Sequence, residues 1–457
     1  MIPATKNMVI KTMLVKTRLQ SPAKFTGGPG LFLLVSLTLL GLWACGGSAT
    51  STPRAPDVLT PVPTLEQPAT PAARQPTSQL TGQPETVTAA EVPTGSTRSG
   101  PPRLVPILDR TLHTVPLMDI LFDTFGGQPR FVPLDLAADD IIVNLRDVIR
   151  PIDNPVYGPA TALPWLEDDN LVIGYRSENG AYAYPVNILD LHEIVNDNLD
   201  GVPVLITYCP LCSSGVVFSR EVGDDILTFG NTSALYMSDL VMYDTLTGSF
   251  WFQVRGEAVV GALSGSRLKL LASTTITWGE WKKLFPESHV LTGMNEDPAM
   301  FAEIVYGRGV STGFQERINN ADFVFPVDPR KLDDRLKYGE LVLTVEIDDA
   351  VIAFPLGLIG DGVVNHQVAG APVVVFARSD GSAEAAFSRN LNSQLLTFEF
   401  QEEGQQFVDQ ETGSVWDALG RGVSGPLAGE ELEQLKTRRS FWFSVAIAFP
   451  DADIFFP

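Results

Sequence analysis

The feature that most constrains the fold of this chain is a repeat of its own sequence. Residues 170–290 and 340–457 resemble each other at a nearly constant spacing, with a shift of 169 or 170 positions that drops to 165 and then to 164 in the later part. Matching segments occur in the same order in both stretches: YP and FP (184–185 and 354–355), FSR and FSR (218–220 and 387–389), TGS and TGS (247–249 and 412–414). Self-similarity over this length is typical of a duplicated folding unit. We therefore expect two tandem, diverged copies of one unit.

Each copy carries the local patterns of short strands and a few short helices. Apolar runs at 171–175 and 181–184 flank the turn-forming segment SENG, which is a hairpin pattern. The β-branched run at 202–207 predicts a buried strand, and residues 188–195 and 278–285 have the one-sided apolar spacing of short helices. The predicted fold class is α+β with predominantly antiparallel β-structure. Residues 103–169 lead into the first copy, and residues 291–339 connect the copies.

The N-terminal part of the chain has the pattern of an exported lipoprotein. Basic residues precede an apolar run at 31–44, and no Asp or Glu appears before Asp57. A run of this length is too short to span a bilayer but suits the core of a signal peptide. It leads into LWACGG, which resembles a bacterial lipobox with Cys45 as the lipidated residue. We expect residues 1–45 to be a lipoprotein signal peptide, starting at Met1, Met8 or Met13; an ordinary cleaved signal is the alternative.

Residues 46–102 are rich in Pro, Thr, Ser, Ala and Gln and contain few large apolar residues. Such a segment cannot bury enough apolar surface to offset the entropy cost of ordering it, so we expect a disordered tether. The predicted location is the extracytoplasmic face of the cell membrane, with the membrane as partner through Cys45. The formal net charge of −22 excludes a nucleic-acid partner, which would require a basic face. The sequence leaves protein partners open.

The repeat also separates framework residues from functional candidates. Core and turn residues recur in both copies, whereas a polar residue present in only one copy needs another explanation. The candidates found only in the first copy are His192, Cys209, Cys212, Met237 and Asp239. We therefore expect the first copy to carry a site and the second copy to act as a scaffold.

Five motifs together resemble a known family. They are PIDNP (151–155), HEIVND (192–197), TYCPLC (207–212), SDLVMYD (238–244) and GPLAG (425–429). Over roughly residues 145–457 the chain resembles the prokaryotic domain-of-unknown-function 3179 family. The resemblance implies a shared fold and no established activity.

The pair Cys209 and Cys212 has the spacing of a metal-binding or redox motif. As a metal site, it would combine the two thiolates with His192 as a third ligand, and Met237 and Asp239 are further candidates for the same site. Soft sulfur and imidazole ligands favour copper or zinc. The second Cys-x-x-Cys pair that would identify a zinc ribbon does not occur in the sequence.

Three other interpretations of the cysteine pair stay open at this point. A dithiol/disulfide oxidoreductase, with Cys209 as the attacking sulfur, requires a lowered thiol pKa, usually from a helix N-terminus or a cation. A disulfide across this short loop would contribute only about 2 kcal/mol, which suits a non-catalytic interaction module with a structural disulfide. A cysteine nucleophile would need His192 as its base. The sequence does not decide whether the protein is an enzyme.

Overall fold

The computed structural model describes residues 104–294, 303–307, 309 and 313–457. The predicted signal peptide, the lipidation residue Cys45, the predicted tether and part of the connector lie outside the described residues. The chain divides into two compact units, 1–90 and 91–457, and every described residue belongs to the second unit. None of the helices among these residues has the length and apolar character needed to cross a bilayer.

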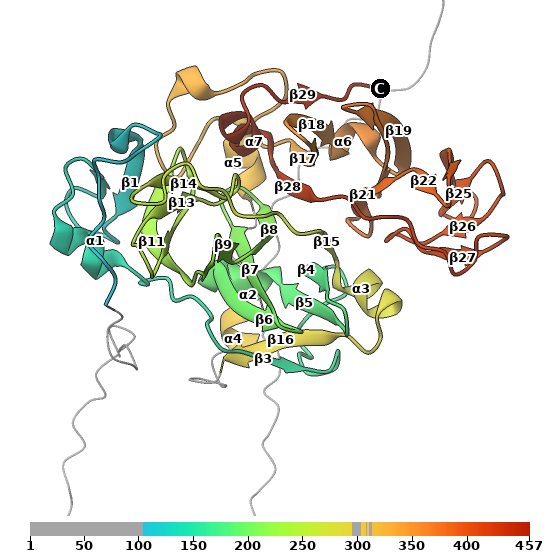
Figure 1. The fold of residues 1–457 in the computed structure, drawn as a ribbon, viewed down its shortest axis with the longest axis horizontal. Coiled ribbons are helices and arrows are strands. Elements are labelled where there is room, and N and C mark those ends of the chain that lie inside the picture. The colour runs from blue at the N-terminus through green and yellow to red at the C-terminus, as the bar shows by residue number, and fades with distance from the viewer. Residues whose placement is uncertain (1–103, 295–302, 308, 310–312) are drawn as a thin grey trace, which may run out of the picture. The chain divides into compact units, whose positions relative to one another are not determined.

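The described part of the chain consists mainly of β-strands with a few short helices (Figure 1). Nearly all strand pairings in it are antiparallel; the two parallel pairings between named strands join β16 to β5 and β29 to β18. The predicted α+β class with predominantly antiparallel β-structure is therefore confirmed. The helices are α1 (Asp139–Leu145), α2 (Val186–His192), α3 (Trp278–Leu284), α4 (Glu303–Tyr306), α5 (Phe314–Asn319), α6 (Leu356–Ile359) and α7 (Trp442–Ala448), with short 3-10 turns at Leu117–Asp119 and Pro329–Lys331.

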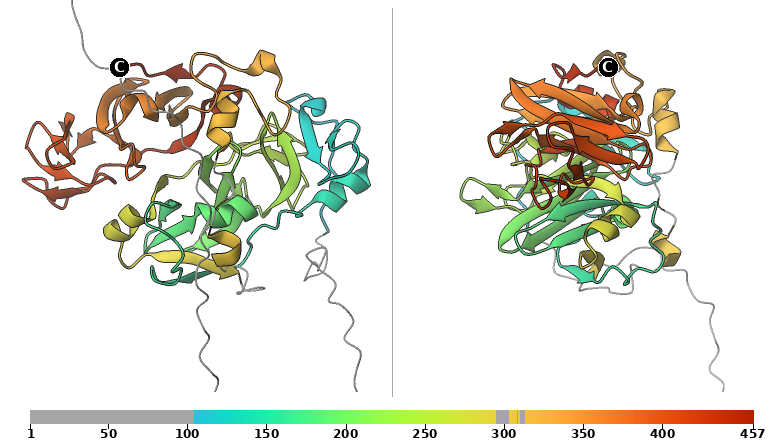
Figure 2. Two further views of the ribbon diagram at one scale, coloured as in Figure 1. Left: turned by 180° about the vertical axis from the view of Figure 1, so that it is seen from behind. Right: turned by 90° about the vertical axis from the view of Figure 1, so that its right-hand side faces the viewer.

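The largest sheet contains strands from both halves of the repeat. Its order is β29 (Asp453–Ile454), β18 (Ala350–Pro355), β17 (Leu341–Ile347), β28 (Thr437–Phe441), β8 (Ser214–Ser219), β7 (Val202–Cys209) and β6 (Ile194–Leu199). The halves meet where β28 pairs with β8, at Arg439 and Gly215. Figure 2 shows the green strands of the first half against the orange and red strands of the second half from two further sides. A Cβ atom at Gly215 would lie 2.8 Å from Ile173 Cδ1 of the five-stranded sheet, so glycine allows that sheet to pack closely against β8.

Two further sheets belong to the first half and the segment that leads into it. The six-stranded sheet has the order β14 (Glu257–Val260), β13 (Phe250–Phe252), β12 (Asp239–Asp244), β11 (Phe229–Tyr236), β1 (Ile120–Asp123) and β2 (Phe131–Pro133). The five-stranded sheet has the order β15 (Thr274–Thr277), β4 (Leu171–Arg176), β5 (Ala181–Pro185), β16 (His289–Met294) and β3 (Pro155–Gly158). Strands β1, β2 and β3 thus extend the sheets of the first half.

The remaining strands form small sheets and hairpins. They are β9 (Glu221–Val222) with β10 (Asp225–Ile226); β19 (Gly362–Val368), β20 (Ala371–Ala377) and β21 (Glu384–Ser388); β22 (Asn390–Leu391) with β23 (Gln394–Leu395); and β24 (Phe398–Gln401), β25 (Gln406–Asp409), β26 (Val415–Trp416) and β27 (Gly422–Ser424). The antiparallel order β19-β20-β21 in the second half matches β6-β7-β8 in the first. The tandem duplication itself stays a prediction from the sequence.

One hydrogen-bonded turn has the same geometry at two places in the chain. Asp244 accepts hydrogen bonds from the Thr247 N–H (2.6 Å) and from Trp251 Nε1 (3.0 Å). Asp409 accepts the equivalent bonds from the Thr412 N–H (2.7 Å) and from Trp416 Nε1 (2.9 Å). These carboxylates satisfy the indole N–H of a buried tryptophan, which explains why an Asp is retained at the start of each turn.

The helix expected at 188–195 is shorter than its apolar pattern indicates. Helix α2 ends at His192, because Glu193 adopts a left-handed conformation with φ of 58°, and its N–H donates to Leu189 O. The apolar residues Ile194 and Val195 then belong to strand β6. Two apolar residues at 194 and 195 fit the buried side of a helix as well as they fit a buried strand. Periodicity alone therefore could not show where helix α2 ends and strand β6 begins.

A buried ion pair lies beside the junction between the two halves. Arg439 of β28 pairs with Glu384 of β21 through Nε, and its Nη1 donates to Ser213 Oγ at 2.9 Å. Both charged side chains are buried. The removal of one partner from a buried pair leaves an uncompensated charge, which is strongly destabilising.

We predict that Glu384→Ala lowers the free energy of unfolding by about 3–5 kcal/mol, because Arg439 then loses its counter-ion. Urea denaturation followed by circular dichroism measures this change. The matched control is Lys283→Ala, which breaks an exposed pair with Glu280 and should cost less than about 1 kcal/mol. Equal costs for the two substitutions would contradict the prediction.

Candidate functional site

The two cysteines lie at one end of adjacent strands in the seven-stranded sheet. Cys209 is the last residue of β7, and Cys212 lies in the tight turn before β8, where its N–H donates to Cys209 O at 3.2 Å. Ser213 completes the turn with a positive φ of 50°. Both cysteines are free, and their Sγ atoms are 2.8 Å apart. The turn therefore holds two unlinked thiols side by side.

A second turn brings a carboxylate to the thiols. Asp239 is the first residue of β12 and pairs with Tyr236 across a two-residue turn formed by Met237 and Ser238. Both turn residues have positive φ angles, of 51° and 68°, as a type I′ hairpin requires. Residues other than glycine and asparagine seldom adopt this conformation. The backbone of the SDLVMYD motif is thus shaped to place Asp239 at the start of its strand.

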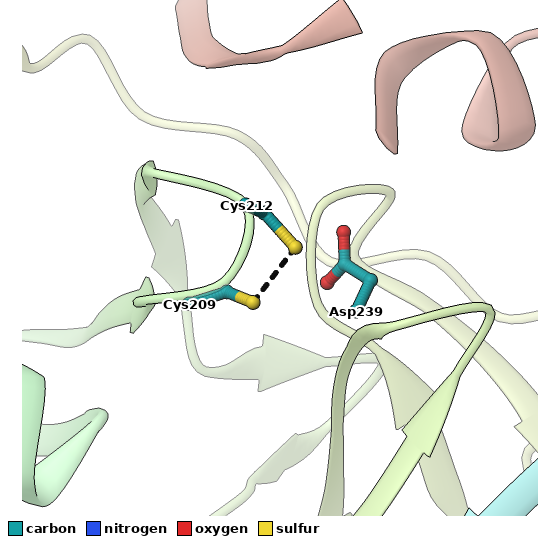
Figure 3. A group of neighbouring side chains, drawn as sticks. All are labelled: Cys209, Cys212 and Asp239. Atoms are coloured by element: carbon teal, nitrogen blue, oxygen red, sulfur yellow. Dashed lines mark hydrogen bonds between the residues drawn. The ribbon is translucent and has the colours of Figure 1, made fainter. Parts of the chain in front are cut away.

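The sulfur atoms of Cys209 and Cys212 and a carboxylate oxygen of Asp239 all lie within 4.8 Å of one another. The carboxylate of Asp239 faces the sulfur atom of Cys212, and the sulfur of Cys209 lies beside it (Figure 3). We call these three side chains the thiol–carboxylate group. Their exposures are 1% or less. They lie in an apolar cluster that includes Ile194, Leu205, Val216, Phe218, Leu240, Phe441 and Phe443.

The hydrogen bonds around this group leave one carboxylate oxygen unsatisfied. Ser444 Oγ donates to Asp239 Oδ2, and Cys212 Sγ donates to Ser238 O at 3.4 Å. Asp239 Oδ1 and the Ser238 hydroxyl are buried and have no hydrogen-bond partner among the described residues. Buried polar atoms without partners are rare in folded proteins, and each one calls for a physical explanation, of which a bound ion is one.

Burial determines the protonation states of the group. It raises the pKa of both thiols above the usual range for cysteine, well above it for Cys212, and the acidic neighbour Asp239 adds to both shifts. Burial also raises the pKa of Asp239 to about 7, against the lowering effects of its contacts with Ser444, the Cys212 side chain and the Leu240 backbone. Without a cation, both thiols are therefore neutral at physiological pH, and Asp239 is partly protonated.

Glu193 is a second carboxylate, close enough to the group to affect the pKa of Cys209. It follows His192 at the left-handed end of α2, and Asn231 donates a hydrogen bond to its Oε2. Burial raises its pKa to about 8, and its charge also raises the pKa of Cys209. Our sequence analysis did not select Glu193, although it lies inside the HEIVND motif next to the histidine that was selected.

The structure brings Asp239, and not His192, to the two sulfur atoms. His192 is buried, with Nδ1 2.6 Å from Arg150 O and Nε2 2.9 Å from Tyr306 Oη. Because a carbonyl can only accept, Nδ1 carries the proton and Nε2 accepts from the tyrosine hydroxyl. Burial lowers the pKa of His192 to about 4, so the imidazole is neutral. Both ring nitrogens of His192 thus have hydrogen-bond partners. His192, the expected third ligand, lies outside the thiol–carboxylate group.

Met237, the other additional candidate, is also outside the group. Its Sδ accepts a hydrogen bond from the Asp328 N–H at 3.3 Å. The side chain packs in a different apolar cluster, together with Tyr236, Phe252 and Trp442. The conformation of Met237 shapes the turn before Asp239, while its thioether contacts another part of the core.

We predict that the metal-free protein loses stability as pH rises through the pKa of Asp239. The folded-state pKa of about 7 lies above the ordinary value of 3.8, so the stabilising contribution is complete below pH 4 and is lost between pH 4 and pH 7. For a shift of this size the loss is about 4 kcal/mol. Asp239→Asn stays neutral and should lose less stability over this range.

Urea denaturation of both proteins at pH 4.5 and pH 7.5, in the presence of a chelator, measures the difference. Glu193 titrates in the same direction and is electrostatically coupled to Asp239, so some pH dependence should persist in Asp239→Asn. Parallel stability curves for the two proteins would show that Asp239 does not titrate in this range.

Comparison with known proteins gives a family and no further relative. The family model described as "Protein of unknown function (DUF3179)" matches residues 146–452. No curated protein matches the chain, and neither does any solved structure. The matched segment covers well over half of the chain and contains the cysteine pair, Asp239 and Ser444, together with the whole first half of the repeat and residues 340–452 of the second half. The chain therefore belongs to the DUF3179 family.

Proposed function

We propose that the protein is a lipid-anchored extracytoplasmic protein that binds one soft or borderline metal ion in its folded part. The ligands are Sγ of Cys209, Sγ of Cys212 and Oδ1 of Asp239. The observation that carries the proposal is the buried carboxylate oxygen without a hydrogen-bond partner, beside two unlinked thiols. A buried carboxylate is stable only when it is neutral, paired or bound to a metal, and a cation would also deprotonate the adjacent thiols.

The ligand types favour zinc over copper. Copper(I) prefers soft sulfur and imidazole ligands, whereas zinc accepts thiolates together with a carboxylate. His192 and Met237, the imidazole and thioether that would favour copper, have other contacts. Two thiolates and a carboxylate with a divalent ion leave one net negative charge in the buried site, and a monovalent ion would leave two. Binding releases one proton from each thiol, and the proton of Asp239 where it carries one.

A dithiol/disulfide oxidoreductase is the second candidate, supported by the 2.8 Å separation of the sulfur atoms. Its chemistry requires an accessible thiolate. Both thiols are instead buried, and their pKa values are raised by that burial. An interaction module with a structural disulfide is the third candidate, and it requires a bond between two cysteines that are free here. Metal binding fits the burial and the unsatisfied carboxylate better than either alternative.

We predict that the full-length protein, purified in detergent, contains one zinc ion per chain. Cys209→Ser, Cys212→Ser and Asp239→Asn should each remove most of the zinc, because each removes one of three ligands. Elemental analysis with a thiol titration measures this. His192→Gln is the control, since its side chain lies outside the group, and it should keep the metal. A metal-free wild type with one disulfide per chain would contradict the proposal.

The membrane anchor is a separate part of the proposal, supported by the lipobox-like LWACGG segment. We predict that Cys45→Ala abolishes incorporation of a labelled fatty acid and moves the protein from the membrane to the soluble fraction. Cys209→Ser serves as the control for labelling of other cysteines. Equal labelling of wild type and Cys45→Ala would rule out Cys45 as the lipidation site.

A further inference from the structure

Residues from the second half of the chain donate hydrogen bonds to the thiol–carboxylate group and to the cysteine turn. The three candidate ligands come from β7, the following turn and β12, all in the first half. Ser444 of α7, in the second half, donates the hydrogen bond to Asp239 Oδ2. Phe441 N–H and Ser440 Oγ donate to Cys212 O at 2.8 Å and 3.2 Å. The second half therefore contacts both the carboxylate and the cysteine turn.

The hydrogen bond from Ser444 makes the two oxygens of Asp239 different. Oδ2 is held by the hydroxyl, and Oδ1 is left buried without a partner. A free carboxylate could rotate and offer either oxygen, but this contact fixes its plane. Carboxylate ligands in metal sites are commonly oriented by such a second hydrogen bond. The contact thus leaves Oδ1 as the oxygen available to a metal.

The position of Ser444 is itself fixed by packing. Helix α7 follows β28 directly, and its side chains Trp442, Phe443 and Val445 are fully buried. The Trp442 N–H donates to Glu340 O at 2.8 Å, and Phe443 N–H donates to Tyr338 O at 2.9 Å. Ser444 is buried as well. Its hydroxyl therefore has little freedom to turn away from Asp239.

The corresponding helix of the first half provides an internal comparison. By the shift of the repeat, Ser444 of α7 corresponds to Glu280 of α3. Glu280 forms an ion pair with the exposed Lys283 in its own helix. The backbone contact near each helix is nevertheless similar: Phe441 N–H donates to Cys212 O, and Thr277 N–H donates to Gly381 O at 3.1 Å. Of these two helices, only α7 has a hydroxyl at this position, and it donates to the carboxylate of Asp239.

We infer that Ser444 is a positioning residue for the metal site, and that the metal affinity of the first half depends on the second half through it. This inference rests on the proposed metal binding. Ser444 does not bind the metal; it holds Oδ2 and leaves Oδ1 available as the ligand. The second half, expected to be only a scaffold, thereby contributes to the chemistry of the site.

The test compares Ser444→Thr with Ser444→Val in the full-length protein. Threonine and valine have nearly the same volume, so both variants carry the same packing cost, and only threonine keeps the hydroxyl. Zinc affinity is measured by competition with a chromophoric chelator. We expect Ser444→Thr to bind nearly as wild type and Ser444→Val to bind 10–100-fold more weakly, the usual effect of losing such a contact.

A second readout reports the ligand geometry directly. Cobalt(II) in place of zinc gives visible absorption bands that depend on the ligands, and these should change in Ser444→Val and not in Ser444→Thr. Thr344→Val is the control, because it removes a buried hydroxyl that donates to Arg438 O at 3.4 Å, away from the site. Equal affinities and spectra for the two Ser444 variants would overturn the inference while leaving metal binding intact. A wild type that binds no zinc would overturn both.

Discussion

The site depends on the burial of a carboxylate beside two adjacent thiols, without a cation among the close contacts of the carboxylate. Asp239 satisfies one oxygen through Ser444 and leaves the other without a partner, in a cluster of apolar side chains. This arrangement favours the neutral forms of all three groups, as the raised pKa values of Asp239, Cys209 and Cys212 reflect. A bound metal ion would reverse that preference, because it would stabilise the ionised ligands. The proposed metal-loaded state would therefore differ from the metal-free state in protonation as well as in occupancy.

The sequence predicted which residues form the site better than it predicted how these residues are arranged. Cys209, Cys212 and Asp239 were all selected because the second copy lacks them, and the structure brings them together. His192 was chosen as a ligand by residue type, but helix α2 directs it to Arg150 O and Tyr306 Oη. Tyr306 is more than a hundred positions away along the chain, and no local pattern could indicate that contact. Glu193 was missed because a carboxylate after a helix usually faces solvent.

The fold was predictable at the level of class and local elements, and less so in its long-range pairing. The repeat and the alternating apolar runs indicated antiparallel strands and short helices, including α3 and the hairpin of β4 and β5. They indicated two tandem, diverged copies of one unit and did not indicate which strands pair between the copies. The structure joins β28 to β8, so one sheet runs through both halves. The partners in this pairing, Arg439 and Gly215, lie far apart in the sequence, and periodicity does not encode which strands pair over such a distance.

The cysteine turn of the first half and the corresponding turn of the second half differ in burial. This difference, rather than turn geometry alone, determines which chemistry each turn can support. Cys209 and Cys212 correspond to Arg378 and Gly381, and both turns connect antiparallel strands of a similar three-stranded order. In the first half Pro210, inside the turn, is buried, whereas Ser379 and Asp380 in the second half are exposed. The Ser379 N–H donates to Asp361 Oδ1, and Asp380 Oδ1 accepts from the Ser382 N–H. An exposed carboxylate such as Asp380 is stabilised by water and by Arg378 Nε at 3.9 Å, and it needs no metal ion. The buried carboxylate beside Cys212 has no such alternative, and for this reason the first turn is the one suited to a metal.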